Sequence, residues 1–238
     1  MRKVLVIVAA VIATVVAVGL VLFPAGKAPV LVHAGLSPVR TPDAPSLPLP
    51  HPYSDALPAK GKYLVAGRSI ADPRFQETVV LLIAYGHAGA TGLIINRPTK
   101  VPLTEMLPSM PGLNKRSDVI YYGGPVEGQR MLILIRSDEK LDESDKVFLN
   151  VYVSMSKNTL DRMIGAHKTQ KQIRVYAGYA EWSPGQLNRE VWRGDWYIID
   201  ADADSIFEKK ESEIWQELIR RSSAIEVCKH DKDERSKS

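Results

Sequence analysis

The sequence contains a single cysteine, Cys228, among its 238 residues. This excludes a disulfide within the chain, so hydrophobic burial alone must stabilise any folded domain, which is feasible at this size. The chain also lacks a long run of one charge sign: its 31 basic and 27 acidic residues are interspersed, and the net charge is +4. Nucleic-acid binding usually concentrates Lys and Arg on one face, so we expect no nucleic-acid partner.

Metal-ligand spacing is also missing. The five histidines show no spacing typical of a zinc site. Acidic residues between Asp200 and Glu211 resemble a calcium-binding loop, but Ser205 stands where such a loop needs glycine. Carboxylates that cap a helical turn explain the same pattern. We therefore predict neither a metal nor a cofactor.

The sequence has no complete catalytic motif. Residues 67–71 around Ser69 resemble a nucleophile elbow, but Ala71 replaces its last glycine and Pro73 interrupts the helix that should follow. A non-catalytic protein is therefore favoured over an enzyme.

Residues 4–23 form an uncharged, hydrophobic run that follows Arg2 and Lys3. Twenty residues of helix span about 30 Å, the thickness of a bilayer core, and exceed the usual apolar region of a signal peptide. An uncleaved anchor is favoured, although the small-residue spacing at residues 32–34 leaves cleavage and secretion to the periplasm as the alternative. The basic residues before the run favour a cytoplasmic N-terminus. We predict a single-pass inner-membrane protein whose domain is periplasmic.

The next segment, residues 24–59, carries nine of the sixteen prolines. Proline fixes φ and removes a backbone donor, so this segment is expected to be an extended spacer that reaches up to about 110 Å. The folded domain is predicted over residues 60–222, and residues 223–238 are predicted to form a charged, disordered tail.

The domain pattern consists of short apolar runs separated by Gly, Pro, Asp and Asn, which is typical of strands joined by turns. One helix is expected from a cap at Ser156 to about His167, and another from Ser212. Because strands outnumber helices and the two do not alternate strictly, an α+β fold is favoured over a doubly wound parallel sheet. Strands are expected over residues 63–66, 78–84, 93–95, 119–122, 131–135, 147–153, 173–176 and 196–199.

Four loop motifs follow predicted strands: Asp72–Phe75, Gly92–Pro98, Gly123–Val126 and Gly178–Leu187. Their order and spacing closely resemble the AlgH/YqgE family of bacterial proteins, over about Gly61 to Trp215. The resemblance implies a mixed, largely closed β-barrel-like sheet with a few flanking helices. It carries over no catalytic residue and no cofactor. Most relatives are cytoplasmic and lack the N-terminal hydrophobic run, and this departure argues against a direct role on DNA.

Three groups in these motifs are candidates for a functional surface. Asp72, Arg74, Asn96 and Arg97 are expected to form a polar cluster, either a structural ion-pair network, which is favoured, or an anion site. The pair Gly123 and Gly124 is interpreted as a structural turn rather than an anion-binding loop. The third group is the aromatic segment of Tyr179, Trp182 and Gln186.

The aromatic segment has two interpretations. Packed inward, its side chains seal the sheet, which is the default; exposed, they would anchor a partner protein, and Trp182 would then be partly accessible to solvent. We predict a membrane-tethered, non-catalytic binding or regulatory module that acts through protein contacts. The alternatives are a hydrolase, or other small-molecule enzyme, that uses the polar cluster, and a cytoplasmic transcriptional regulator.

Overall fold

The computed structural model describes residues 56–113, 116–169 and 171–222. The hydrophobic run at residues 4–23, most of the predicted spacer and the predicted tail lie outside these residues, so the structure does not test the anchor. In the part of the chain that is described, no helix is both long and apolar enough to cross a membrane.

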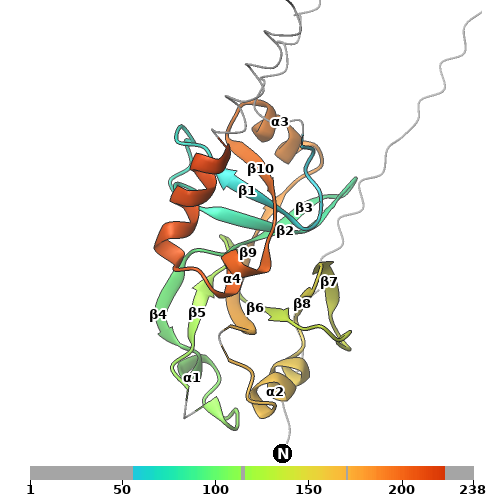
Figure 1. The fold of residues 1–238 in the computed structure, drawn as a ribbon, viewed down its shortest axis with the longest axis vertical. Coiled ribbons are helices and arrows are strands. Elements are labelled where there is room, and N and C mark those ends of the chain that lie inside the picture. Colours follow the sequence, from blue (N-terminus) through green and yellow to red (C-terminus); the bar gives the residue numbers. More distant parts are fainter. Residues whose placement is uncertain (1–55, 114–115, 170, 223–238) are drawn as a thin grey trace, which may run out of the picture. The chain divides into compact units, whose positions relative to one another are not determined.

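The strands form one mixed ten-stranded sheet (Figure 1). Its main path runs β10-β1-β2-β3-β9-β6-β8-β7, and β4 pairs with β5, which in turn pairs with β9. All pairs are antiparallel except β5 with β9. The strands are β1 (Lys62–Ala66), β2 (Val79–Gly86), β3 (Gly89–Ile94), β4 (Pro98–Pro102), β5 (Val119–Tyr122), β6 (Val126–Arg136), β7 (Asp145–Phe148), β8 (Val151–Ser154), β9 (Ile173–Trp182) and β10 (Trp196–Asp200).

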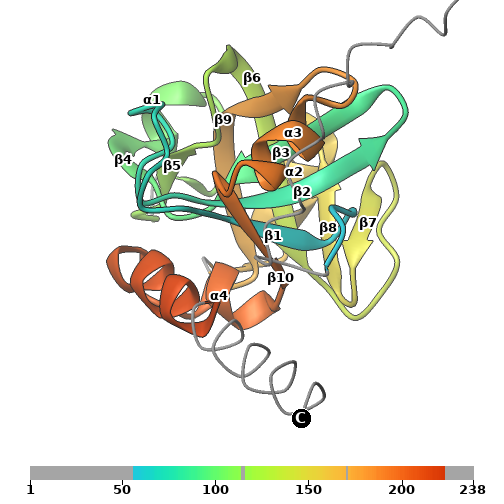
Figure 2. The same cartoon turned by 90° about the horizontal axis from the view of Figure 1, so that it is seen from above.

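The sheet curls because β9 changes partners along its length (Figure 2). Its first half pairs with β5 and β6, and its second half pairs with β3. Gly178, with φ of 71°, lies between the halves and supplies the left-handed backbone that turns the strand. The predicted α+β class and mixed sheet are confirmed. The predicted near-closure is not observed, because in the described residues the end strands β10 and β7 do not pair, and the sheet is a curled half-barrel.

Few helices accompany the sheet: α1 (Leu103–Met106), α2 (Lys157–Gly165), α3 (Gln186–Trp192), α4 (Ala203–Phe207) and a helix over residues 211–222. The predicted cap of α2 is confirmed, since the Ser156 side chain accepts a hydrogen bond from the Thr159 amide. Asp202 caps α4 in the same way, accepting from the Ser205 amide at 2.7 Å. The acidic pattern that resembles a calcium loop therefore includes a helix cap.

Two apolar clusters form the core. The larger one joins β1, β2 and β10 to the helix over residues 211–222, through Ile214, Trp215, Leu218 and Ile219. The smaller one lies under α2 and includes Leu160, Met163 and Ile164, which follow one another at spacings of three and one and lie on the buried face of that helix.

One strand was predicted wrongly. Residues 147–153 were expected to form a single alternating strand, but they form the end of β7, a turn and the start of β8. Leu149 lies in that turn with φ of 34° and a side chain 75% exposed. Apolar residues alternate on both sides of the turn, so the sequence pattern alone does not reveal it. The start of β8 is set instead by its pairing with β6.

Candidate functional site

The predicted polar cluster separates into two groups. Asp72 and Arg74 form an exposed ion pair, with Arg74 Nη2 2.6 Å from Asp72 Oδ2. Hydrogen bonds from the Arg74 guanidinium hold the pKa of the Asp72 carboxyl below its ordinary value. In the described residues, no side-chain hydrogen bond or ion pair joins this pair to Asn96 or Arg97.

Asn96 and Arg97 instead hold the loop that precedes β2. Asn96 accepts a hydrogen bond from the Val79 amide and donates one to the Glu77 carbonyl, each at 2.9 Å. Arg97 Nη2 donates to the Gln76 carbonyl oxygen at 2.6 Å. These bonds support the structural interpretation of the cluster. The hydrolase alternative requires the four side chains to act together, and this arrangement does not favour it.

Gly123 and Gly124 lie where β5 ends beside the kink of β9. A Cβ atom on Gly123 would be 2.2 Å from the Gly178 carbonyl oxygen, and one on Gly124 would be 2.2 Å from the carbonyl carbon of Tyr179. Any side chain at these two positions would therefore push the strands apart. The close backbone approach supports the interpretation of a structural turn.

The aromatic segment is packed inward. Trp182 is 3% exposed, so the alternative interpretation, in which Trp182 is partly accessible to solvent and anchors a partner, is wrong. Its ring packs against the rings of Phe75 and Trp196, at centroid distances of 6.2 and 5.9 Å. The segment therefore seals the sheet, as the default interpretation holds, because the indoles bury a large area and their N–H groups have a partner inside the fold.

That partner is Glu190 of α3, a residue that the sequence did not single out. Its Oε2 atom accepts hydrogen bonds from the indoles of Trp182 and Trp196, at 2.8 and 2.9 Å. Its Oε1 atom accepts from the Gln186 amide at 2.9 Å. The four-residue spacing of Gln186 and Glu190 on a helix predicts that these two side chains meet. It does not predict that Glu190 also accepts hydrogen bonds from the two indoles.

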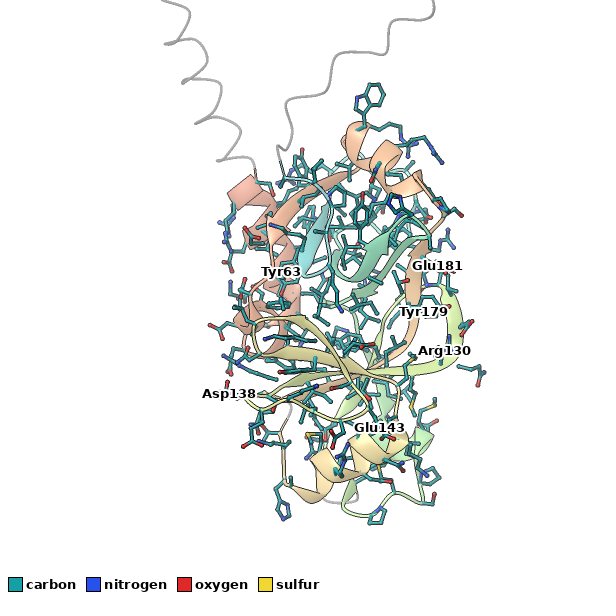
Figure 3. The ribbon with its side chains drawn as sticks, turned by 90° about the vertical axis from the view of Figure 1, so that its right-hand side faces the viewer. Tyr63, Arg130, Asp138, Glu143, Tyr179 and Glu181 are labelled. Carbon is teal, nitrogen blue, oxygen red and sulfur yellow. The ribbon has the colours of Figure 1, made fainter. Side chains whose placement is uncertain are left out.

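A cleft of about 660 Å³ lies between the rest of the sheet and the β7–β8 hairpin. Of the predicted site residues, only Tyr179 lines it. Figure 3 shows Glu181, Tyr179 and Arg130 along one side, with Glu143 further along the same face. The lining residues come from six strands and two loop segments: Ile83, Ala84, Thr91, Arg130, Leu132, Glu143, Ser144, Asp145, Val153, Ser154, Met155, Tyr179 and Glu181.

The cleft has an apolar floor and an acidic rim. Leu132 and Ile83 are buried, and Met155 is 64% exposed. Three carboxylates, Glu143, Asp145 and Glu181, line the cleft with one guanidinium, that of Arg130. Arg130 is itself paired with a carboxylate outside the lining, since its Nη1 is 3.0 Å from Glu127 Oε2. The electrostatic character of the cleft is therefore negative.

Two residues of the lining stand out, Tyr179 for the pKa of its hydroxyl and Glu143 for its backbone conformation. Partial burial, together with the charges of Glu127 and Glu181, raises the pKa of the Tyr179 hydroxyl, which stays protonated at neutral pH.

Glu143 has φ of 55°, a region that residues other than glycine rarely adopt. Its carboxylate accepts from Ser156 Oγ at 2.6 Å and its carbonyl from Ser154 Oγ at 2.6 Å. This acidic group is thus fixed at the mouth of the cleft.

Strand edges border the cleft on two sides. Beyond Leu82, β2 pairs only with β3 within the described residues. On the opposite side, β7 is the last strand of the sheet and pairs only with β8 in the same part of the chain. Sequence reasoning missed the cleft because its lining comes from segments up to 98 positions apart (Ile83 to Glu181).

Comparisons with known proteins find one family. A family described as AlgH-like matches residues 63–225. A UPF0301 protein of Caulobacter vibrioides is 33% identical over 166 residues, which is 68% of this chain and 85% of the relative. A UPF0301 protein of Rhodococcus opacus is 31% identical over 165 residues, covering 68% and 81%.

Two solved structures share the fold. The solution structure of the AlgH protein from Pseudomonas aeruginosa has a TM-score of 0.56 at 30% identity, covering 68% of this chain and 87% of that one. An X-ray structure of a Corynebacterium diphtheriae protein has a TM-score of 0.60 at 23% identity, covering 70% and 88%. The second likeness concerns the fold alone.

Proposed function

The chain belongs to the AlgH-like family, and on this premise we propose that it is a non-catalytic binding module that acts through contacts with another protein. Residues 4–23 tether this module to the inner membrane, and the spacer holds it on the periplasmic side. The cleft between the sheet and the β7–β8 hairpin is the surface that receives the partner.

The observation that carries this proposal is the combination of an apolar floor with strand edges that have no further strand partner in the described residues. An exposed strand edge recognises an extended polypeptide through its backbone, while neighbouring pockets accept alternate side chains. Met155, 64% exposed at the cleft, supplies a flexible apolar contact suited to that role. An extended segment of another protein therefore matches the cleft better than a compact polar metabolite does.

The acidic rim adds a charge preference. Glu143, Asp145 and Glu181 outnumber the single cleft guanidinium, which already has a carboxylate partner. Because complementary potentials select partners and suppress like-charged ones, the preferred segment carries Lys or Arg side chains. The partner class is thus an extended, basic segment of a protein.

Site-specific crosslinking tests the location. A photo-reactive phenylalanine analogue replaces Met155 in the full chain, and membranes containing the protein are irradiated. The matched control carries the analogue at Leu149, which is 75% exposed but lies in the β7–β8 turn outside the cleft lining. We expect a protein adduct at position 155 that weakens when Glu143 and Glu181 are replaced by Gln. Equal adducts at both positions, or none at position 155, would contradict the proposal.

A further inference from the structure

A second cleft, about 640 Å³, lies beside the loop between β1 and β2 and shares no lining residue with the first. It is lined by Gly67, Arg68, Pro73, Gln76, Glu77, Arg97 and Trp215. Two of these residues are arginines and one is a carboxylate, so the charge balance is the reverse of that in the first cleft. A ligand for this cleft would accordingly be an anion.

Arg68 is held in place by an aromatic ring. Its guanidinium carbon lies 5.4 Å from the centroid of the Trp215 ring, in the range of a cation–π contact. The Trp215 indole is fixed in turn, because it is 7% exposed and donates a hydrogen bond to the Ala66 carbonyl at 2.8 Å. The position of Arg68 is thus partly organised before any ligand arrives.

Among the described residues, the Arg97 side chain is anchored at the other side of this cleft through a single donor. Its Nη2 atom bonds to the Gln76 carbonyl, and the guanidinium has further N–H donors. The loop that it holds is fixed independently by Asn96. The other N–H donors of the Arg97 guanidinium can therefore bind two oxygen atoms of an anion in bidentate fashion.

The two guanidiniums differ from most arginines of this domain in having no carboxylate partner. In the described residues, ion pairs within 4 Å involve Arg74, Arg116, Arg130, Arg136, Arg162, Arg174, Arg193 and Arg221. Arg68 and Arg97 form none, although Glu77 lines the same cleft. Two unpaired cations in one cleft repel each other, and an anion between them would remove that repulsion.

We propose that Arg68 and Arg97 bind a doubly charged oxyanion, with Trp215 as the apolar wall of the site. The ligand class is a small molecule that carries a phosphate group or two carboxylates, since both present oxygen pairs that match guanidinium donors. The proposal is independent of the first cleft, because the two clefts have no residue in common.

Calorimetric titration of the detergent-solubilised full chain tests the site. The probes are inorganic phosphate, phenyl phosphate and succinate at constant ionic strength, with sodium chloride as the reference. We expect saturable binding that weakens at least tenfold in Arg68→Gln and in Arg97→Gln. Arg189→Gln is the matched control, because Arg189 also forms no ion pair in the described part of the chain and lies outside the cleft.

The outcomes separate the ligand sources. Tighter binding of phenyl phosphate assigns a phosphate ligand with an apolar group, and tighter binding of succinate assigns a dicarboxylate. In the described part of the chain the Arg68 side chain contacts the Trp215 ring and forms no hydrogen bond, so Arg68→Gln remains a folded test even if Arg97→Gln destabilises the loop. No saturable binding, or an equal loss in the Arg189→Gln control, overturns the proposal.

Discussion

At the scale of single residues, the burial of two indole rings depends on one carboxylate. Glu190 accepts from the indoles of Trp182 and Trp196, and both rings are at least 97% buried. Removing the carboxylate leaves two buried N–H groups without an acceptor, each of which costs about 1–3 kcal/mol. In the aromatic segment, a single polar side chain therefore stabilises the burial of apolar rings in the core.

Glu190→Ala should accordingly lower the free energy of unfolding by about 2–4 kcal/mol. Glu190→Gln keeps one acceptor oxygen and should lose about half as much. Urea unfolding followed by tryptophan fluorescence measures both values. A loss below about 0.5 kcal/mol in Glu190→Ala would show that the indoles do not depend on this carboxylate.

At the scale of elements, the helix over residues 211–222 is tied to the sheet through a buried polar group. Glu211 Oε1 lies 3.1 Å from Arg174 Nη2 of β9 and accepts a hydrogen bond from the Tyr121 hydroxyl of β5 at 2.6 Å. The Arg174 guanidinium also lies 4.8 Å from the Tyr121 ring centroid. The neighbouring Tyr176 hydroxyl is buried and has no hydrogen-bond partner among the described residues.

These two tyrosines should respond differently to loss of the hydroxyl. Tyr121→Phe removes a bond to a charged acceptor and should destabilise the fold by about 1.5–3 kcal/mol. Tyr176→Phe removes an unpaired buried hydroxyl and should be neutral, or stabilising by up to about 1 kcal/mol. Urea unfolding of the two variants side by side measures the difference. Equal destabilisation would contradict this account of the contact between helix and sheet.

The same tyrosines predict alkaline sensitivity. Burial raises the pKa of Tyr121 and Tyr176 above the ordinary value of 10.0. A raised pKa in the folded state means that the contribution to stability is fully present below about pH 10 and is lost as the pH rises above it. Stability measured between pH 8 and 11 should therefore fall, and it should fall less steeply in Tyr176→Phe. A flat profile would show that these hydroxyls are not buried in solution.

Elements defined by local signals were predicted well, and those defined by pairing were not. The Ser156 cap and the apolar spacing that follows it specify α2 within one segment. By contrast, β4 begins and ends with proline, and it exists because Pro98 and Pro102 lie opposite β5. The division between β7 and β8 likewise depends on a partner strand. No local pattern carries that information.

The candidate sites show the same limit. The structural interpretation of the motif glycines could be reached from the sequence because close backbone approach is a property of glycine itself. The burial of Trp182 depends on Glu190, Phe75 and Trp196, which lie up to 107 positions from it. The cleft at Tyr179 similarly requires β2 and the β7–β8 hairpin to face each other. The fold brings these distant residues together, and their spacing in the sequence does not show that they meet.

At the scale of the whole molecule, the proposal joins the described domain to a membrane segment that lies outside it. Residues 4–23 should remain attached and span the inner membrane, with the domain in the periplasm. Fractionation should recover the chain in the membrane. Protease added to intact spheroplasts should digest the domain.

Two results would reject this topology. A soluble mature chain that begins shortly after residue 34 would show cleavage by signal peptidase. A domain protected in intact spheroplasts but digested after lysis would place it in the cytoplasm. The alternative of a cytoplasmic regulator would then regain support.

Fluorescence polarisation measures whether the acidic cleft binds an extended basic segment, as we propose. The probes are labelled nine-residue peptides that alternate valine with lysine or valine with glutamate, added to the detergent-solubilised full chain. The test variant replaces Glu143, Asp145 and Glu181 with their amides. The matched control makes the same change at Glu105, Asp161 and Glu213, which are exposed outside the cleft lining.

We expect saturable binding of the lysine peptide that is at least tenfold tighter than that of the glutamate peptide. This preference should be lost in the cleft variant and retained in the control, and it should weaken with added salt because the contacts are electrostatic. If the cleft and control variants lose binding equally, the attraction reflects total charge alone. If neither peptide binds, the cleft is not the surface that this protein uses.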